Sequence, residues 1–168
     1  SKLLIKDGGL DQVKLMEELE QAERSGKPYM LIGATSSFVH MFDFLEKQGR
    51  TFRLPEGSRM MDTGGIKGKS REMGLEEFYE RLSLTCNVSR NRCLNMYGMS
   101  ELSTQFYDNG NDTIPSVKSG PHWIRTRVVN PLTGEDVREG QTGVITHCDL
   151  ANFNSVTTIL TEDAGRIV

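Results

Sequence analysis

Segments with helical spacing of apolar side chains alternate with short apolar runs along the N-terminal part of the chain. Helical spacing predicts helices over about 11–24, 36–48 and 70–84, and apolar runs predict buried strands at 29–32, 58–62 and 94–96. Strands separated by helices are typical of an α/β unit whose strands run parallel. Ligands of such sheets lie beyond the carboxyl ends of the strands. We therefore expect Gly33, Gly64–Gly65 and Tyr97–Gly98 to gather at one edge.

The pattern changes after about Asn109. A turn cluster at 109–112 is followed by short apolar runs at 123–129, 143–147 and 156–160, separated by turn residues. Partial alternation in the first of these runs indicates antiparallel sheet. We expect an α/β subdomain over residues 1–110 and a smaller, incomplete β-rich subdomain over 111–168.

Composition excludes several classes of protein. A net charge of -3 over 168 residues disfavours a nucleic-acid binder. The apolar runs are far shorter than the roughly 20 residues that span a bilayer, and charges at Lys2, Lys6 and Asp7 do not suit a signal peptide. The three cysteines are odd in number and lack metal-ligand spacing, which fits a reducing compartment. We expect a cytoplasmic protein with no integral membrane segment.

The stretch Leu94–Glu101 ends an apolar strand and passes within a few residues to groups that can hold a ligand. The Tyr97 ring offers a face on which a purine can stack, and Gly98 lets a ligand approach the backbone. Ser100 supplies a hydroxyl and Glu101 a carboxylate that can hold Mg²⁺ beside phosphates. The alternative is a strand followed by an ordinary turn, with Glu101 solvated or capping a helix.

A glycine- and lysine-rich stretch at 64–70 lies between a predicted strand and a predicted helix, as a phosphate-binding P-loop does. The P-loop needs four residues between its first glycine and the Gly-Lys pair, whereas Gly64 leaves three. We therefore reject the P-loop. A glycine loop whose backbone approaches a ligand and a flexible connection both remain open.

Three separated pieces of the sequence resemble the adenylate-forming superfamily. Residues 97–101 resemble its Tyr-Gly-x-Thr-Glu signature, Asp62–Gly65 its glycine loop, and Thr161–Arg166 its Thr-Gly-Asp motif. Within the superfamily, residues 59–72 look most like the acyl-protein synthetase of the bacterial luminescence system, with phenylacetate-CoA ligase close behind. The resemblance implies that both subdomains belong to a large N-terminal domain, the second being barrel-like.

The resemblance also implies a reaction and a set of roles. A fatty or other carboxylic acid would react with ATP, with Mg²⁺ as cofactor, to give an acyl adenylate, and a thiol would then displace AMP. Tyr97 would stack on adenine, and Gly98 would belong to the nucleotide-binding site. Gly64 and Gly65 would line the adenine and acyl pocket, and Ser100, in place of threonine, would contact phosphate. Glu101 would bind Mg²⁺, and Asp163 would accept hydrogen bonds from the ribose.

Other parts of that family have no counterpart in the sequence. The resemblance implies that the phosphate loop lies upstream, and that the catalytic lysine and the acceptor cysteine lie downstream. None of Cys86, Cys93 and Cys148 therefore inherits the acceptor role. We expect a fragment that holds no catalytic residue and is inactive alone.

The acceptor and the acyl chain stay open. An acyl-reductase partner protein would fit an acyl-protein synthetase, whereas CoA would fit an aryl- or acyl-CoA ligase. A non-catalytic scaffold or binding module is the remaining alternative. Phe38, Met41 and Phe42 could line an acyl pocket, but their helical spacing favours core packing.

Overall fold

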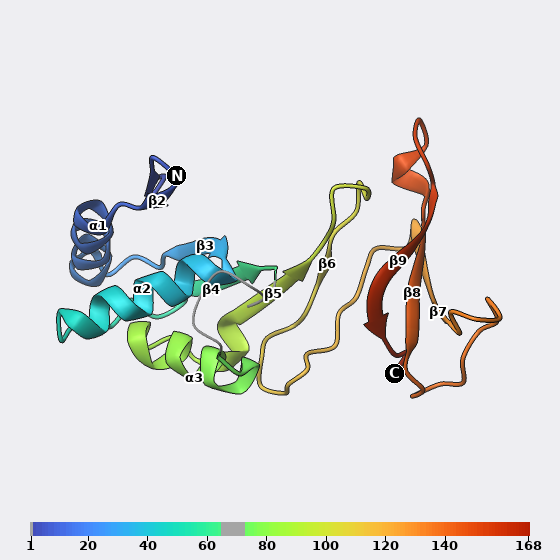
Figure 1. The fold of residues 1–168 in the computed structure, drawn as a ribbon. Coiled ribbons are helices and arrows are strands. Elements are labelled where there is room, and N and C mark those ends of the chain that lie inside the picture. Colours follow the sequence, from blue (N-terminus) through green and yellow to red (C-terminus); the bar gives the residue numbers. More distant parts are fainter. Residues whose placement is uncertain (1, 65–72) are drawn as a thin grey trace. The chain divides into compact units, whose positions relative to one another are not determined.

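A computed structural model describes residues 2–64 and 73–168 of the chain. After a short antiparallel hairpin, helices alternate with parallel strands and a group of antiparallel strands follows, an order that the sequence predicts apart from the hairpin (Figure 1). No helix in the described part of the chain is long and apolar enough to cross a membrane.

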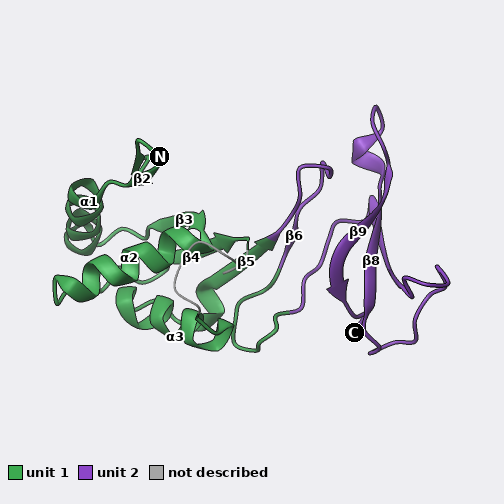
Figure 2. Ribbon diagram, viewed as in Figure 1, with its two compact units in different colours: residues 1–96, 108–116 green, residues 97–107, 117–168 purple. Residues whose placement is uncertain are grey.

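The chain divides into two compact units (Figure 2). Unit 1 comprises residues 1–96 and 108–116, and unit 2 comprises residues 97–107 and 117–168. This division differs from the single boundary near residue 110, because residues 108–116 return to unit 1. The Asp108 carboxylate accepts a 3.0 Å hydrogen bond from the Asn95 backbone N–H, and the Asn111 side chain donates to the Cys93 carbonyl.

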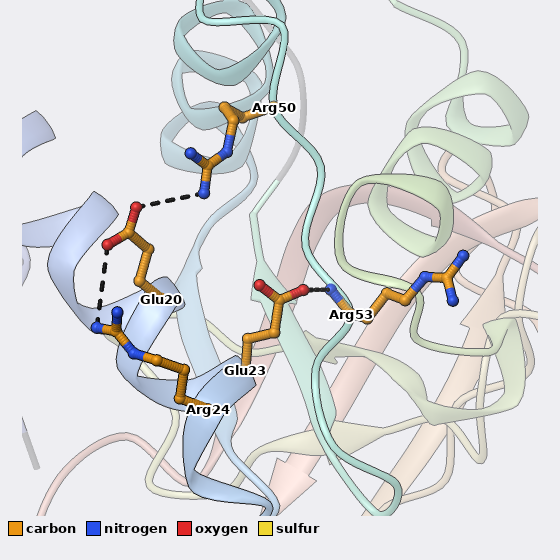
Figure 3. A network of polar contacts seen from close by, with 5 residues as sticks. All are labelled: Glu20, Glu23, Arg24, Arg50 and Arg53. Carbon is orange, nitrogen blue, oxygen red and sulfur yellow. Dashed lines mark hydrogen bonds and ion pairs between the residues drawn. The ribbon is translucent and has the colours of Figure 1, made fainter.

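Unit 1 begins with a small antiparallel hairpin, β1 (Ile5–Lys6) and β2 (Gly9–Leu10), followed by helix α1 (Gln12–Ser25). The side chain of Asp11 caps α1 by accepting a hydrogen bond from the Lys14 N–H. Polar contacts join α1 to the segment after the next helix (Figure 3). Glu20 pairs with Arg50 at 3.2 Å, and Glu23 accepts a 2.8 Å hydrogen bond from the Arg53 backbone N–H.

The parallel strands are β3 (Met30–Ala34), β4 (Arg59–Thr63) and β5 (Cys93–Tyr97), in that spatial order. Helix α2 (Thr35–Lys47) follows β3, and helix α3 (Leu75–Cys86), with the short 3-10 helix η1 (Arg90–Arg92), precedes β5. The helices α2 and α3 lie side by side over the sheet (Figure 1) and share an aromatic contact, with 5.6 Å between the ring centroids of Phe42 and Phe78. Phe38, Met41 and Phe42 are all buried in this core.

Two details of the sequence predictions were wrong. β3 is not fully buried: it is the edge strand of the sheet, and on one of its faces the alternate side chains Met30 and Ile32 are 48% and 63% exposed. Helix α3 does not extend back to residue 70. It begins at Leu75, after Gly74 in an extended conformation, with Glu76 and Glu77 in its first turn, where carboxylates favour a helix N-terminus. Ser70, the first residue of the predicted helix, lies outside the described residues.

Unit 2 contains β6 (Phe106–Tyr107) and an antiparallel sheet of order β7-β8-β9, formed by Ile124–Val129, Gly143–Asp149 and Thr158–Gly165. The short 3-10 helix η2 (Leu150–Asn152) follows β8. β7 and β8 lie so close together at Gly143 that a Cβ atom there would be 2.6 Å from the Val129 carbonyl oxygen. The described part of unit 2 thus contains a three-stranded antiparallel sheet, as the alternation predicts.

Candidate functional site

Tyr97 is the last residue of β5 and the first of unit 2. Its half-buried ring lies 5.9 Å from the ring of Phe106 and 5.8 Å from that of His147, measured between centroids. Its hydroxyl donates a 2.8 Å hydrogen bond to Oδ2 of Asp163. Burial raises the pKa of Tyr97 above its usual range, and the hydrogen bond to Asp163 raises it further, so the phenol is protonated at neutral pH.

Asp163 lies within β9, on an exposed part of the strand. The sequence prediction of a strand at 156–160 ends too early, because β9 continues to Gly165. The Asp163 backbone N–H donates to Oγ1 of Thr161, and that hydroxyl donates in turn to the Ile145 carbonyl of β8. These bonds hold the backbone beside Asp163, and the Asp163 carboxylate accepts its hydrogen bond from Tyr97.

Ser100 and Glu101 lie on the exposed turn that follows β5. The Ser100 hydroxyl donates a 3.1 Å hydrogen bond to the Glu101 carboxylate. The Glu101 backbone carbonyl accepts a 2.9 Å hydrogen bond from the side-chain amide of Asn152. Within residues 2–64 and 73–168, no group of three or more His, Cys, Asp and Glu side chains could hold a metal ion by itself.

His147 lies beside Tyr97 and Phe106 in the aromatic cluster of unit 2. It is 2% exposed, and its ring lies 4.9 Å from that of Phe106. Its Nδ1 contacts the Thr126 hydroxyl at 3.0 Å, while Nε2 has no hydrogen-bond partner in the described part of the chain. Burial lowers the pKa of His147, and the nearby charges of Asp149 and Asp163 oppose that shift.

Asp149 ends β8 and is fully buried. Its carboxylate accepts hydrogen bonds from the Thr104 hydroxyl at 2.7 Å and from the backbone N–H groups of Ser103 and Ala151. The Thr104 hydroxyl also accepts a 2.9 Å hydrogen bond from the Trp123 indole. Asp149 therefore fixes Ser103 and Thr104, which follow Glu101 after one intervening residue.

In unit 1, a second buried carboxylate organises the carboxyl ends of the parallel strands. Asp62, 1% exposed, accepts hydrogen bonds from the Thr35 hydroxyl at 2.8 Å, the Tyr79 hydroxyl at 2.9 Å and the Asn95 amide at 2.9 Å. These donors come from α2, α3 and β5, respectively. Burial, followed by the Asp62 charge, raises the pKa of Tyr79 well above its usual range.

The same network supports the loop after β4. The Thr35 hydroxyl lies 3.1 Å from the Thr63 carbonyl oxygen and 3.2 Å from that of Gly64. Gly64 has a φ of 86°, which a side chain would strain, so glycine is favoured where the chain leaves the strand. Gly65, the second predicted glycine of this loop, lies outside the described residues.

The predicted site residues thus fall into two groups. Tyr97, Gly98, Ser100, Glu101 and Asp163 belong to unit 2, whereas Gly64 belongs to unit 1. Within unit 2 the structure brings Tyr97 to Asp163 and Ser100 to Glu101. Sequence reasoning missed four supporting residues, which are His147, Asp149 and Asn152 in unit 2 and Thr35 in unit 1. No sequence motif marks them, because each makes contacts with residues far away in the sequence.

Solved structures share this fold. ATP-bound MatB from Rhodopseudomonas palustris matches with a TM-score of 0.59 and 17% identity, over 94% of this chain and 31% of that one. The luciferase-like enzyme from the nonluminescent mealworm Zophobas morio matches with a TM-score of 0.62 and 18% identity, over 90% of this chain and 38% of that one. At these identities the likeness shows the fold alone.

Sequence relatives narrow the family. The long-chain-fatty-acid–luciferin-component ligase of Vibrio harveyi is 24% identical over 161 residues, which cover 94% of this chain and 41% of that protein. The chain therefore spans well under half the length of this curated relative. The family described as "Acyl-protein synthetase, LuxE" matches residues 2–168. Because that match covers nearly the whole chain, the chain belongs to the acyl-protein synthetase family.

Proposed function

We propose that this chain carries nucleotide- and acyl-binding residues of a ligase that activates a long-chain fatty acid with ATP and transfers the acyl group to a thiol. The observation that carries the proposal is the hydrogen bond between Tyr97 and Asp163, which joins two residues of separate family-like motifs. Membership of the acyl-protein synthetase family supports it, as do the fatty-acid ligase relative and the ATP bound to the matching MatB structure.

The proposed nucleotide contacts come mainly from unit 2. The Tyr97 ring would stack on adenine, with Gly98 allowing close approach of the ligand to the backbone. One Asp163 oxygen accepts from Tyr97, and the other would accept from a ribose hydroxyl. The Ser100 hydroxyl would contact phosphate. Gly64 and Gly65, from unit 1, would line the adenine and acyl pocket.

Glu101 is the proposed Mg²⁺ ligand. Its carboxylate is exposed and has the Ser100 hydroxyl beside it. Mg²⁺ that accompanies a nucleotide takes one or two protein carboxylates and completes its shell with phosphate oxygens and water. A single exposed carboxylate therefore fits the ion, whose bound charge would offset that of the phosphates.

The proposed reaction has two steps. A carboxylate oxygen of the fatty acid attacks the α-phosphorus of ATP, and the bond to pyrophosphate breaks to give an acyl adenylate. A thiol sulfur then attacks the acyl carbonyl, loses its proton and releases AMP. We propose a protein thiol as the acceptor, as the family description suggests, and an acyl-reductase protein as the partner.

We also propose that the protein works in the cytoplasm. Cys86, Cys93 and Cys148 are all free thiols, which a reducing compartment would preserve.

Calorimetric binding of AMP, ATP and a non-hydrolysable acyl-adenylate analogue, with and without Mg²⁺, tests the nucleotide site. Asp163→Ala should weaken binding of all three ligands about ten-fold or more, because a ribose acceptor is lost. Glu162→Ala is the matched control, since Glu162 is the exposed acidic neighbour of Asp163 on the same strand. Equal affinity of the two variants, or no binding by the unmodified chain, would contradict the proposal.

A further inference from the structure

The exposed turn that carries Glu101 is attached to the loop after β8 by side-chain hydrogen bonds. We infer that Asn152 is a positioning residue for Glu101: it holds the backbone from which the proposed Mg²⁺-binding carboxylate projects, and so governs how MgATP binds. The inference rests on the proposed function and extends it to a residue outside the family-like motifs.

The Asn152 side chain joins two segments through all of its polar atoms. Its amide donates to the Glu101 carbonyl and to the Val156 carbonyl, both at 2.9 Å. Its Oδ1 accepts a 3.2 Å hydrogen bond from the Ser103 hydroxyl. An amide is suited to this place because it can donate to two carbonyls and accept from a hydroxyl at once.

Asp149 supplies the rigid end of this connection. It is fully buried and binds the Ser103 N–H and the Thr104 hydroxyl on one side of the junction, and the Ala151 N–H on the other. Hydrogen bonds to a buried carboxylate are stronger than those between neutral groups. Residues 103–104 and 150–151 are thus fixed to the end of β8. Asn152 connects this fixed segment to Glu101 through its hydrogen bond to the Glu101 carbonyl.

The position of the Glu101 carboxylate depends on the Asn152 hydrogen bond to its backbone, because the Glu101 side chain is exposed and its carboxylate accepts from the adjacent Ser100. A shift of the backbone moves the carboxylate away from the phosphate-bound ion. Tyr97 and Asp163 are anchored through β5, β8 and β9 instead. Loss of the Asn152 amide should therefore weaken Mg²⁺-dependent binding of ATP and leave Mg²⁺-independent binding of AMP unchanged.

Asn152→Asp is the informative variant, since it keeps the oxygen that accepts from Ser103 and removes both donated hydrogen bonds. Asn152→Ala removes the whole side-chain contact. Asn154→Ala is the control, because Asn154 is an exposed asparagine in the same loop. Circular dichroism and thermal melting of each variant establish that it is folded.

Two measurements are made on each folded variant. Hydrogen–deuterium exchange of residues 99–104, without nucleotide, should be about ten-fold faster in both Asn152 variants than in the control, in keeping with the loss of one or two hydrogen bonds. The Mg²⁺ concentration that half-saturates ATP binding should rise about ten-fold, while AMP affinity stays within two-fold of the unmodified chain.

The outcomes separate the inference from the proposed function. Unchanged exchange of residues 99–104 in Asn152→Asp would overturn the positioning role whatever the nucleotide does. Faster exchange with an unchanged Mg²⁺ requirement would also overturn it, provided that Glu101→Gln abolishes that requirement. If Glu101→Gln leaves the Mg²⁺ requirement intact, the proposed metal role of Glu101 fails, and the inference fails with it.

Discussion

The hydroxyl of Tyr97 donates a 2.8 Å hydrogen bond to the carboxylate of Asp163, 66 residues further along the chain. The contact joins the end of a parallel strand to the middle of an antiparallel one. It also occupies one of the two carboxylate oxygens that a ribose could use. A nucleotide that binds here must therefore share Asp163 with Tyr97 or displace the phenol.

Substitutions of Tyr97 should distinguish the contribution of the ring to AMP affinity from that of the hydroxyl. Tyr97→Phe keeps the stacking surface and releases Asp163, so AMP affinity should stay within about three-fold of the original or improve. Tyr97→Ala removes the stacking surface, which is worth about 1–3 kcal/mol per base, so affinity should fall about ten-fold or more. Calorimetry measures both, with the exposed Tyr107→Ala as the control. Equal losses in the Phe and Ala variants would argue against stacking.

Thr35→Val should disturb the loop after β4, because the buried hydroxyl donates to the Asp62 carboxylate at 2.8 Å and lies 3.2 Å from the Gly64 carbonyl oxygen. We expect a loss of about 1–2 kcal/mol in the free energy of unfolding and weaker binding of the acyl-adenylate analogue. Thr35→Ser, which retains the hydroxyl, should restore both. Denaturant unfolding and calorimetry measure these changes.

Ser58→Ala provides the matched control for Thr35. Ser58 is a buried hydroxyl at the start of β4, where it bonds the Pro55 carbonyl and the Tyr29 N–H. Loss of the Ser58 hydroxyl should lower the free energy of unfolding, but the folded variant should bind the acyl-adenylate analogue with unchanged affinity. If Ser58→Ala weakens analogue binding as much as Thr35→Val does, Thr35 has no specific part in the loop.

Acid should destabilise the protein through His147. Its folded-state pKa is lowered by burial, so the unfolded chain takes up a proton first as the pH falls below about 6.5. The contribution of the neutral His147 side chain to the free energy of unfolding is therefore fully present above about pH 6.5. It is lost below that pH, by at most about 1.4 kcal/mol per pH unit. His147→Asn should flatten the dependence of the melting temperature between pH 7.5 and 5.5. The exposed His122→Asn should not, and an equal effect of both would exclude this role of His147.

Thiol reactivity should distinguish the three cysteines. Burial raises the pKa of Cys86 and of Cys93 to about 12, so neither forms appreciable thiolate at pH 8. Cys148 is only half-buried. Ellman's reagent should titrate one thiol in the native protein and three in 6 M guanidinium. Cys148→Ser should reduce the native value to zero, and a native value of two or more would contradict the burial of Cys86 and Cys93.

Much of the architecture was predictable from local patterns. Helical spacing over residues 11–24 predicted α1, and the alternation of strands with helices predicted that β3, β4 and β5 run parallel. These features depend on neighbouring residues in the sequence, so their signal is local. The exposure of Ile32 was not predictable, because an edge strand and a central strand differ only in what packs beside them.

The sequence by itself predicted the types of most elements, and the motifs around Tyr97 and Asp163 indicated the family that the chain resembles. Only the tertiary structure decided that the Tyr97 hydroxyl meets Asp163, that Asp62 gathers donors from α2, α3 and β5, and that Asn152 holds the backbone of Glu101. The physical reason is the distance along the sequence over which each effect acts. A propensity or a motif acts over a few residues, whereas these hydrogen bonds join side chains 17 to 66 positions apart whose meeting depends on strand register and core packing.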